Sequence, residues 1–302
     1  MKIIRKLKSN LEFVIEALKM LLLNHNLFFV YLKFRVVRLT PRWIMFRGVN
    51  ELKDIFGVKY YYDFEYLGQG LGPKQMYFNC YEIATVEFMR KTLQPGDTFI
   101  DVGANVGYLT AVGMSIVGKK GEVHSFEPIK EYFNYITKIK ESNNEYKLYV
   151  NNIALGSKSG FETIDFSKPP HFGGSSIVKG LIRNANRSIR TEKVKIKVKR
   201  LDEYIKDNKL KSVSLIKIDV EGYEYSVLKG LQGYFETTSF RPVIICEITP
   251  SAYKLLEINI NKLLEYMQMY GYKPYNIINI KKEIDIRQFK CGKDVVFICK
   301  NT

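Results

Sequence analysis

The segment 97–108 runs from an apolar strand directly into a glycine loop and then into a helix. Its apolar residues up to Val102 predict a strand that is buried on both faces, as in parallel sheets covered by helices. The pattern changes at Gly103, and residues 109–114 then predict a helix. Glycines at such a junction let backbone N–H groups approach a ligand that a side chain would exclude. The segment therefore predicts an open α/β sheet with a ligand site at the carboxyl ends of its strands.

A second predicted strand, Glu122–Glu127, ends on a carboxylate that lies about twenty residues after the loop. An acid at that position accepts hydrogen bonds from ribose hydroxyls in sheets that bind nucleosides. The dinucleotide fingerprint needs glycines at its first, third and sixth positions, whereas this chain has Gly103, Asn105 and Gly107. The loop and the first helical turn also lack a basic residue that would hold a pyrophosphate. A nucleoside cofactor without phosphates is therefore predicted, and S-adenosylmethionine fits that description.

Four motifs occur in order along the chain. They are Gly96–Gly107, Phe126–Pro128, Asn152–Gly156, and Ile216–Glu224 with Val227–Gly230. Together they resemble the FkbM family of S-adenosylmethionine-dependent methyltransferases, and their order and spacing make the resemblance specific. It implies a class I methyltransferase fold, which is a Rossmann-like, mainly parallel seven-stranded sheet with helices on both faces and a reversed final pair of strands. It also implies methyl transfer, usually to oxygen and often on sugars or secondary metabolites.

The predicted elements divide the chain at residue 80. Residues 1–80 are expected to form a basic amphipathic helical extension, up to Gly48, and an aromatic-rich ribbon with a β-hairpin or edge strands around Tyr60–Tyr66. Residues 81–302 are expected to form the methyltransferase domain, because strands and helices alternate there. Its strands are predicted at 98–103, 121–127, 147–155, 213–220, 242–248, 273–280 and 294–299, and its helices at 82–93, 129–142, 223–235 and 251–270.

Residues 157–200 interrupt this alternation between core strands three and four. A connection of that length needs a structure or a purpose of its own, so a β insertion on the acceptor side is predicted. Within it, Lys193–Lys199 alternates lysine with β-branched residues, which predicts a strand with one buried and one strongly basic face. The basic face either meets an anionic acceptor or protects an edge strand from aggregation.

The net charge of +16 is concentrated in two segments. Residues 1–50 hold ten Lys or Arg and two Glu, and residues 157–200 hold eleven Lys or Arg and three acids, so each carries +8. No run in the first segment approaches the ~18 uncharged residues of a membrane span. The segment is expected either to pack as a helical cap on the domain or to bind along an anionic membrane surface. The expected location is the cytoplasm, peripheral at the inner membrane face in the second case, and nucleic acid is the less favoured partner.

The cysteines and histidines predict no metal centre. Cys80, Cys246, Cys291 and Cys299 lack the paired spacing of metal and redox motifs, and Cys246 and Cys299 lie in apolar runs. Free thiols in a reducing compartment are therefore expected, with those two buried. The chain has only three histidines, which are scattered.

Polar residues end several of the predicted strands and form the candidate cofactor site. Glu127 is predicted to bind the cofactor ribose, or alternatively to cap the segment after Pro128. Asp101 and Asn105 are predicted to shape the loop and meet the methionine part of the cofactor, and Asn152 to meet the adenine edge. The complete predicted cofactor set is Asp101, Gly103, Asn105, Gly107, Glu127 and Asn152.

The candidate catalytic residues are Lys217, Asp219 and Glu221, which alternate along one strand end and so are expected to share a face. Methyl transfer to oxygen needs alignment and removal of the hydroxyl proton. Asp219 is predicted to position the acceptor or act as general base, Glu221 to bind the acceptor, and Lys217 to keep a carboxylate ionised. The alternatives are an architectural Lys217–Asp219 pair and, less favoured, a divalent metal held with Glu247. His171, in the insertion, is a second base candidate.

The leading functional hypothesis is O-methylation of a sugar hydroxyl in a glycan, glycolipid or secondary metabolite. An RNA or DNA methyltransferase is the second hypothesis, motivated by the net charge of +16. Against it, the sequence Asp219-Val-Glu221-Gly differs from the Asn-Pro-Pro-Tyr or Pro-Cys arrangement of base methyltransferases. The third hypothesis is a membrane-docked binding module without catalysis.

Overall fold

The computed structural model describes residues 51–62, 71–167, 175–181 and 191–299. The chain divides into two compact units, one made of residues 1–50 and 63–83 and the other of residues 51–62 and 84–302. In the first unit the structure describes one helix, α5 (Leu71–Tyr77), and the turn that follows it. The predicted amphipathic helix before Gly48 and the base candidate His171 lie outside the described residues.

The aromatic-rich ribbon begins with an antiparallel hairpin of β1 (Glu51–Ile55) and β2 (Val58–Tyr62), which confirms the predicted hairpin. It belongs to the second unit and not to the N-terminal extension, where the predicted boundary at residue 80 had placed it. The reason is packing. The buried Tyr60 contacts the ring of Tyr108 edge-on, and the Asn143 side chain bonds both backbone groups of Lys59 at 2.7 and 2.9 Å.

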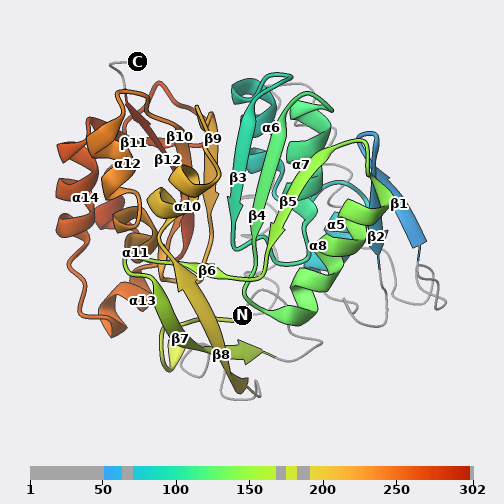
Figure 1. Ribbon diagram of the computed structural model, residues 1–302. Helices are drawn as coiled ribbons and strands as arrows, with labels where there is room; N and C mark the ends of the chain where they lie inside the picture. Colours follow the sequence, from blue (N-terminus) through green and yellow to red (C-terminus); the bar gives the residue numbers. More distant parts are fainter. Residues whose placement is uncertain (1–50, 63–70, 168–174, 182–190, 300–302) are drawn as a thin grey trace, which may run out of the picture. The chain divides into compact units, whose positions relative to one another are not determined.

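The described part of the second unit is built on a seven-stranded sheet in the order β11-β12-β10-β9-β3-β4-β5 (Figure 1). All neighbouring strands are parallel except β12, which is antiparallel to β10 and β11. This topology confirms the predicted class I methyltransferase fold with its reversed final pair. The strands are β3 (Thr98–Val102), β4 (Glu122–Phe126), β5 (Lys147–Asn151), β9 (Leu215–Ile218), β10 (Val243–Ile248), β11 (Tyr272–Asn276) and β12 (Lys293–Cys299).

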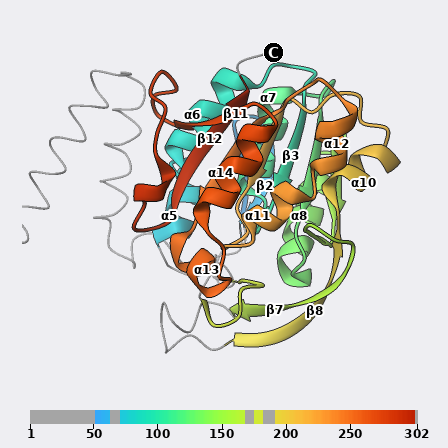
Figure 2. The same ribbon diagram turned by 90° about the vertical axis from the view of Figure 1, so that its left-hand side faces the viewer.

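Helices cover both faces of this sheet, as Figures 1 and 2 show. On one face lie α6 (Ile83–Thr92), α7 (Tyr108–Val117) and α8 (Lys130–Ser142). On the other lie α10 (Leu201–Asp207), α11 (Glu224–Lys229), α12 (Gln232–Thr237), α13 (Pro250–Leu255) and α14 (Ile260–Met269). The strands are therefore buried on both sides, which explains their continuous apolar runs.

Two helices predicted as continuous, 223–235 and 251–270, are each divided in two. The first divides at Gly230, where a Cβ would lie 2.4 Å from the carbonyl oxygen of Gly156. The second divides before Asn259, which begins α14 by accepting a hydrogen bond from the backbone N–H of Asn261.

The insertion forms a second sheet in the order β6-β8-β7, and Figure 1 shows it beyond the carboxyl ends of the main strands. Its strands are β6 (Ala154–Leu155), β7 (Gly160–Ser167) and β8 (Thr191–Lys199). The predicted third core strand therefore ends at Asn151, and its last residues pair with β8 instead. In β8, Ile196 and Val198 are buried and the intervening Lys197 is exposed, which confirms the predicted two-faced strand.

The four cysteines lie within the described ranges, whereas the membrane expectation concerns residues 1–50, which lie outside them. None of the four cysteines forms a disulfide, and Cys246 and Cys299 are buried as predicted. No helix in the part of the chain that the structure describes is both long enough and apolar enough to span a membrane.

Candidate active site

The glycine loop begins where β3 ends, and Gly103 adopts a left-handed conformation with φ of 80°. Its backbone N–H and that of Ala104 both donate to the carbonyl oxygen of Phe126 at the end of β4. A Cβ at Gly103 would lie 1.9 Å from the carbonyl oxygen of Asp219. Glycine is therefore required here because the loop passes against the backbone that follows β9, and this brings the cofactor loop and Asp219 together.

Gly107 is required for a different contact. It caps the start of α7 with φ of 81°, and a Cβ would lie 2.6 Å from Cδ1 of Ile139 in α8. Between the two glycines, Asn105 also has a positive φ, of 51°, and its Oδ1 is buried with no hydrogen-bond partner among the described residues. An unsatisfied acceptor in a buried site is costly, so this atom marks where a ligand donor fits.

Glu127 locks the loop to the start of α8. Its two carboxylate oxygens accept the backbone N–H groups of Asn105 and Ile129, each at 2.8 Å. The capping role that the sequence left open is thus present. Burial raises the pKa of Glu127 to about 8, against the lowering effect of these two hydrogen bonds. A carboxylate offers roughly four lone-pair sites, so two remain for other donors, and ribose binding stays a prediction.

Asn152 and Asp101 hydrogen-bond to groups next to the glycine loop. The Asn152 side-chain amide donates to the carbonyl oxygens of Glu127 and Pro128, both at 2.9 Å, so its contact with adenine stays a prediction. Asp101 is buried and accepts a 2.7 Å hydrogen bond from the Thr110 hydroxyl of α7. Burial raises the pKa of Asp101, although the charge of Lys217 opposes this. Asp101 therefore shapes the strand end from within the sheet.

Lys217 and Asp219 form a close ion pair at the end of β9, with 2.7 Å between Nζ and Oδ2. The Lys217 side chain is 3% exposed and that of Asp219 is 27% exposed, so only the acid reaches solvent. Burial raises the pKa of Asp219, but the adjacent Lys217 charge outweighs this and leaves the pKa below its ordinary value. The pair therefore favours the ionised form of Asp219, and the predicted role of Asp219 as base or acceptor-positioning residue stays a prediction.

Glu247, at the end of β10, adds an acid that the sequence did not assign to catalysis. Burial, together with the charges of Asp219 and Glu221, raises its pKa far above the ordinary range, and it hydrogen-bonds Asp219. A neutral carboxyl donates its proton in such a bond, so a protonated Glu247 is a donor to the charged Asp219. Only the position of Glu247 at a strand end indicated it in the sequence.

Glu221 does not share a strand face with Lys217 and Asp219, because β9 ends at Ile218 and the chain then turns. Glu221 has φ of 51° in this turn. Burial and the nearby Asp219 and Glu224 raise its pKa to about 8. The prediction of a shared face was wrong for Glu221, since strand alternation cannot extend through a turn.

Glu224 organises that turn from within α11. It is fully buried, and its Oε1 accepts the backbone N–H groups of Gly222 at 2.7 Å and Val220 at 3.3 Å. Gly222 has φ of 99°, and a Cβ there would lie 2.1 Å from Cβ of Ala252. Sequence reasoning gave Glu224 no role, although it belongs to the motif Ile216–Glu224.

The insertion contacts this same turn. The Ser176 hydroxyl donates to the carbonyl oxygen of Glu221 at 2.6 Å and accepts the backbone N–H of Val178 at 3.0 Å. The backbone of Ser176 also exchanges two hydrogen bonds with Asp165 of β7, at 2.9 and 3.1 Å. The predicted acceptor-side insertion is thus fastened directly to the turn that carries Glu221.

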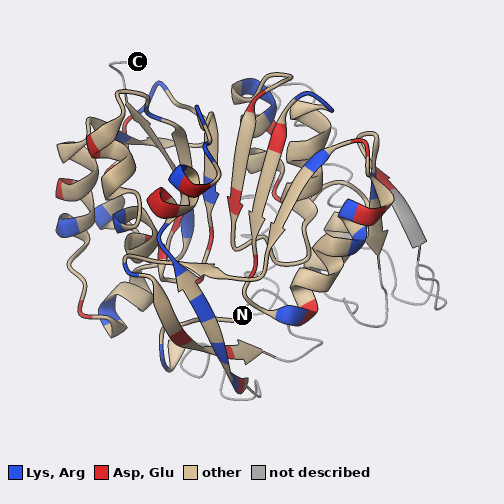
Figure 3. Ribbon diagram, in the orientation of Figure 1, with Lys and Arg blue, Asp and Glu red and all other residues tan. Residues whose placement is uncertain are grey.

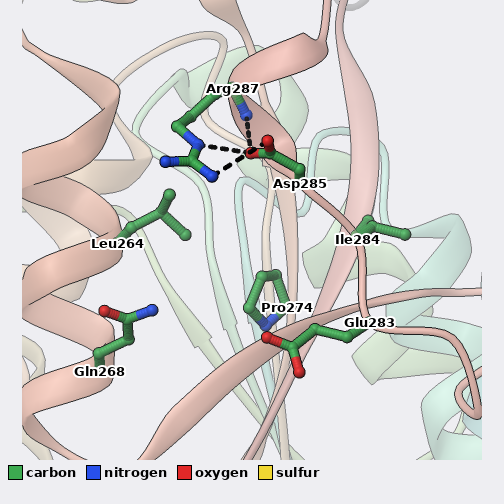
Figure 4. Close-up of a pocket in the computed structure, with 7 residues that line it drawn as sticks. All are labelled: Leu264, Gln268, Pro274, Glu283, Ile284, Asp285 and Arg287. Carbon is green, nitrogen blue, oxygen red and sulfur yellow. Dashed lines mark hydrogen bonds and ion pairs between the residues drawn. The ribbon is translucent and has the colours of Figure 1, made fainter.

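A pocket of about 280 Å³ lies elsewhere, between α14 and the segment that follows β11 (Figure 4). It is lined by Leu264, Gln268, Pro274, Glu283, Ile284, Asp285 and Arg287, none of which belongs to the predicted site. Glu283 and Arg287 are exposed, and the partly exposed Asp285 is paired with Arg287 at 2.7 Å. Among the described residues no cluster of His, Cys, Asp or Glu has the arrangement of a metal site. Among the described residues, the acids Asp101, Glu127, Asp219 and Glu247, which have shifted pKa values, lie at the carboxyl ends of β3, β4, β9 and β10.

The residues at these strand ends fit an S-adenosylmethionine molecule. The unpartnered Asn105 Oδ1 and the remaining acceptor sites of Glu127 suit the donors of a nucleoside. Gly103 keeps the loop free of side chains, and Asp219 places a negative charge close to it. An acidic surrounding suits a cofactor that carries a positive sulfonium and does not suit one that carries a pyrophosphate.

Comparison with known proteins identifies the family of the chain. Residues 101–274 match the family model described as the methyltransferase FkbM domain. The chain is 28% identical over 165 residues to Methyltransferase 1 of Beauveria bassiana, covering 50% of this chain and 62% of that protein. It is 26% identical over 164 residues to the hexuronic acid methyltransferase AglP of Haloferax volcanii, covering 54% of this chain and 60% of that protein.

The chain thus spans less than two thirds of these curated relatives. A solved structure of methyltransferase FkbM from Methylobacillus flagellatus aligns with a TM-score of 0.39 and 15% identity, over 78% of this chain and 56% of that chain. This similarity is too distant for comparison of individual residues. The match of the family model covers more than half of the chain, including the glycine loop and the turn after β9. The chain therefore belongs to the S-adenosylmethionine-dependent FkbM methyltransferase family, which confirms the predicted family and cofactor.

Proposed function

We propose that this protein methylates a hydroxyl group of a sugar unit, with S-adenosylmethionine as methyl donor. The observation that carries the proposal is the ionised Asp219, held by Lys217 and placed against Gly103 of the cofactor loop. A hydroxyl that is to be methylated must be aligned with the donor and must lose its proton. Asp219 is partly exposed and unprotonated, so it can accept that proton at Oδ1, the oxygen not paired at 2.7 Å with Lys217.

The neighbouring groups support this role. Lys217 keeps Asp219 ionised, and Glu247 fixes its orientation through a carboxyl–carboxylate hydrogen bond. Burial is the main cause that raises the pKa of Glu221 to about 8. When protonated, Glu221 is a hydrogen-bond donor and can bind a second hydroxyl of the acceptor. S-adenosylmethionine, when bound, supplies an electrophilic methyl group. The protein residues supply alignment, proton acceptance and exclusion of water.

A sugar acceptor is supported by the name of one relative, the hexuronic acid methyltransferase AglP, at 26% identity. It is also consistent with a site that offers several hydrogen-bonding carboxyl groups. Adjacent sugar hydroxyls match such a site because each can donate to one carboxyl group and accept from another.

The test begins with donor binding, measured by isothermal titration of the full chain with S-adenosylmethionine. Glycan extracts from cells with and without the gene are then compared by mass spectrometry. Methylation of one sugar hydroxyl adds one CH₂, a mass difference of about 14 Da. Asp219→Asn should retain donor binding and lose methyl transfer by roughly 10²- to 10⁴-fold. The control Glu141→Gln removes an exposed carboxylate on α8 and should leave both unchanged. Absence of S-adenosylmethionine binding, or full activity in Asp219→Asn, would refute the proposal.

A further inference from the structure

One face of the insertion presents a row of lysines to solvent. Lys193, Lys195 and Lys197 alternate along β8 and are exposed, as Figure 3 shows by the blue segments along this strand. Within the part of the chain that the structure describes, the ion pairs involve other residues, so these three charges are not neutralised by a carboxylate. Successive lysines are two residues apart, which spaces them by roughly 7 Å along the strand.

The neighbouring strand adds an aromatic side chain to this face. Phe161 of β7 lies opposite Lys197 in the register, and residues directly opposite share a face. The Phe161 side chain is 66% exposed, and the Lys195 ammonium lies 4.7 Å from its ring centroid. We call the surface made by Lys193, Lys195, Lys197 and Phe161 the lysine face. Asp165, opposite Lys193, is an acid on the same face, which leaves a net positive charge.

Protection against aggregation does not account for this arrangement. Lysines on an edge strand discourage pairing with another chain. However, edge protection leaves the exposed Phe161 ring unexplained, because a large apolar ring among the lysines would itself favour association. A surface with an exposed aromatic ring flanked by lysines instead suits a ligand that has both apolar faces and negative charges.

The lysine face is connected to the candidate active site by two contacts. Asp165 exchanges backbone hydrogen bonds with Ser176, and the Ser176 hydroxyl bonds the carbonyl oxygen of Glu221. The two regions differ in charge, because the lysine face is basic, whereas at the site the charge of Asp219 is paired with Lys217 and burial favours the neutral forms of Glu221 and Glu247. A negatively charged group is therefore attracted to the lysine face, whereas a neutral hydroxyl suits the site.

We propose that the lysine face binds an acidic saccharide, so that the acceptor of this enzyme is a sugar chain carrying carboxylates. Phe161 would stack on the apolar face of a sugar ring while the lysines contact carboxylates of successive units, and a hydroxyl of the same chain would reach Asp219. This deepens the proposed function and rests on it for the identity of the reaction. Nucleic-acid surfaces use several stacked aromatic side chains, whereas Phe161 is the only exposed aromatic residue in β7 and β8, because Phe166 is buried.

The experiment measures binding of the full chain to an oligogalacturonide and to the same oligosaccharide made neutral by methyl esterification. The wild-type protein should bind the acidic form, more weakly as salt is raised, and should not bind the neutral form measurably. The variant Lys193→Gln/Lys195→Gln/Lys197→Gln should bind the acidic form ~100-fold more weakly, at roughly fivefold per lysine. Phe161→Ala should weaken binding several-fold without changing its salt dependence.

A matched control removes the same charge elsewhere. Lys206, Lys209 and Lys211 are exposed and lie before the amino-terminal end of β9, whereas the insertion lies beyond the carboxyl ends of the main strands. The variant Lys206→Gln/Lys209→Gln/Lys211→Gln should bind the acidic saccharide like the wild type. Both triple variants should retain the wild-type circular dichroism spectrum and affinity for S-adenosylmethionine, which separates loss of the face from loss of the fold.

Several results would overturn the inference. One is an equal loss of binding in the two triple variants. Another is a lysine-face variant that loses affinity only for phosphatidylglycerol vesicles or for single-stranded RNA. A third is methylation of a neutral sugar chain at the same rate by wild type and lysine-face variant, in which case the proposed function stands and the acidic acceptor does not. Conversely, specific binding of the acidic saccharide without any methyl transfer would refute the proposed function but would still support the lysine face as a binding surface.

Discussion

Gly103 and Gly107 have nearly the same left-handed φ, of 80° and 81°, but they are required by different neighbours. Gly103 has the backbone carbonyl of Asp219 against it, and Gly107 has the side chain of Ile139. A backbone carbonyl at a strand end cannot move without displacing the strand, whereas the end of an isoleucine side chain can rotate. The glycine at position 103 therefore couples the position of the cofactor loop to that of the candidate base, Asp219.

Gly103→Ala is expected to destabilise the protein by roughly 2–4 kcal/mol through backbone strain and the clash with Asp219. It should also abolish binding of S-adenosylmethionine. Urea unfolding and isothermal titration measure the two effects. The control Gly57→Ala has a similar φ of 92° but nothing within 4 Å of the added Cβ, so it reports the strain alone. Equal destabilisation by both variants would show that the clash with Asp219 contributes nothing.

Lys217→Met is expected to lower the free energy of unfolding by about 3 kcal/mol, because the negative charge of Asp219 loses its partner while other buried carboxyl groups lie nearby. The double variant Lys217→Met/Asp219→Asn should recover part of that loss, since it removes the unpaired charge as well. Chemical denaturation of the two variants makes the comparison. If the double variant is less stable than Lys217→Met, the ion pair is not what makes Lys217 necessary.

At the scale of elements, the turn after β9 joins three parts of the chain. Glu224 of α11 holds its backbone N–H groups, Ala252 of α13 packs against Gly222, and Ser176 of the insertion bonds Glu221. The strand pattern predicted β9 but not this turn, because alternation describes a single strand. Contacts from distant segments decide where Glu221 lies.

Ser176→Ala is expected to raise the KM for the acceptor more than it lowers kcat, and to cost about 1 kcal/mol of stability for one lost hydrogen bond. The reason is that the insertion would no longer be held to the turn at Glu221. Steady-state kinetics with varied acceptor and constant S-adenosylmethionine would measure it. Ser175→Ala, at the neighbouring residue that accepts from the Ser167 N–H, is the control and should leave KM unchanged.

At the scale of the whole molecule, several buried acids make stability depend on pH. Burial raises the pKa of Glu127 from 4.5 to about 8 and that of Glu224 to about 7. In this range the folded state holds protons that the unfolded state has lost, so stability falls as the pH rises from about 4.5 to about 8. Asp219 has a lowered pKa and contributes stability that is lost only under strongly acidic conditions, below its ordinary value of 3.8.

The expected result is a free energy of unfolding that is greater at pH 5 than at pH 8, measured by urea denaturation at constant ionic strength. Glu127→Gln should reduce this difference, because it removes one of the protons released on unfolding. Glu141→Gln, an exposed carboxylate on α8, should leave the difference as in the wild type. Stability that rises from pH 5 to pH 8 would contradict the assignment.

The sequence alone determined the family, the cofactor class and most strands, because these depend on local features. The buried run before Gly103, the spacing of the glycines and the carboxylate at Glu127 are each legible within a short segment. The alternating lysines of β8 likewise predicted a strand with a basic face, and the structure confirms it.

Only the tertiary structure decided which of these residues meet. It placed Asp219 against Gly103, brought Glu247 to Asp219, moved Glu221 off the strand face and joined the hairpin β1–β2 to the domain. Each of these facts is a contact between segments far apart in the chain, and no local pattern encodes the distance between them. The strand–loop–helix segment predicted that a cofactor binds, and the packing of β9 and β10 beside it decided which acids lie next to that cofactor loop.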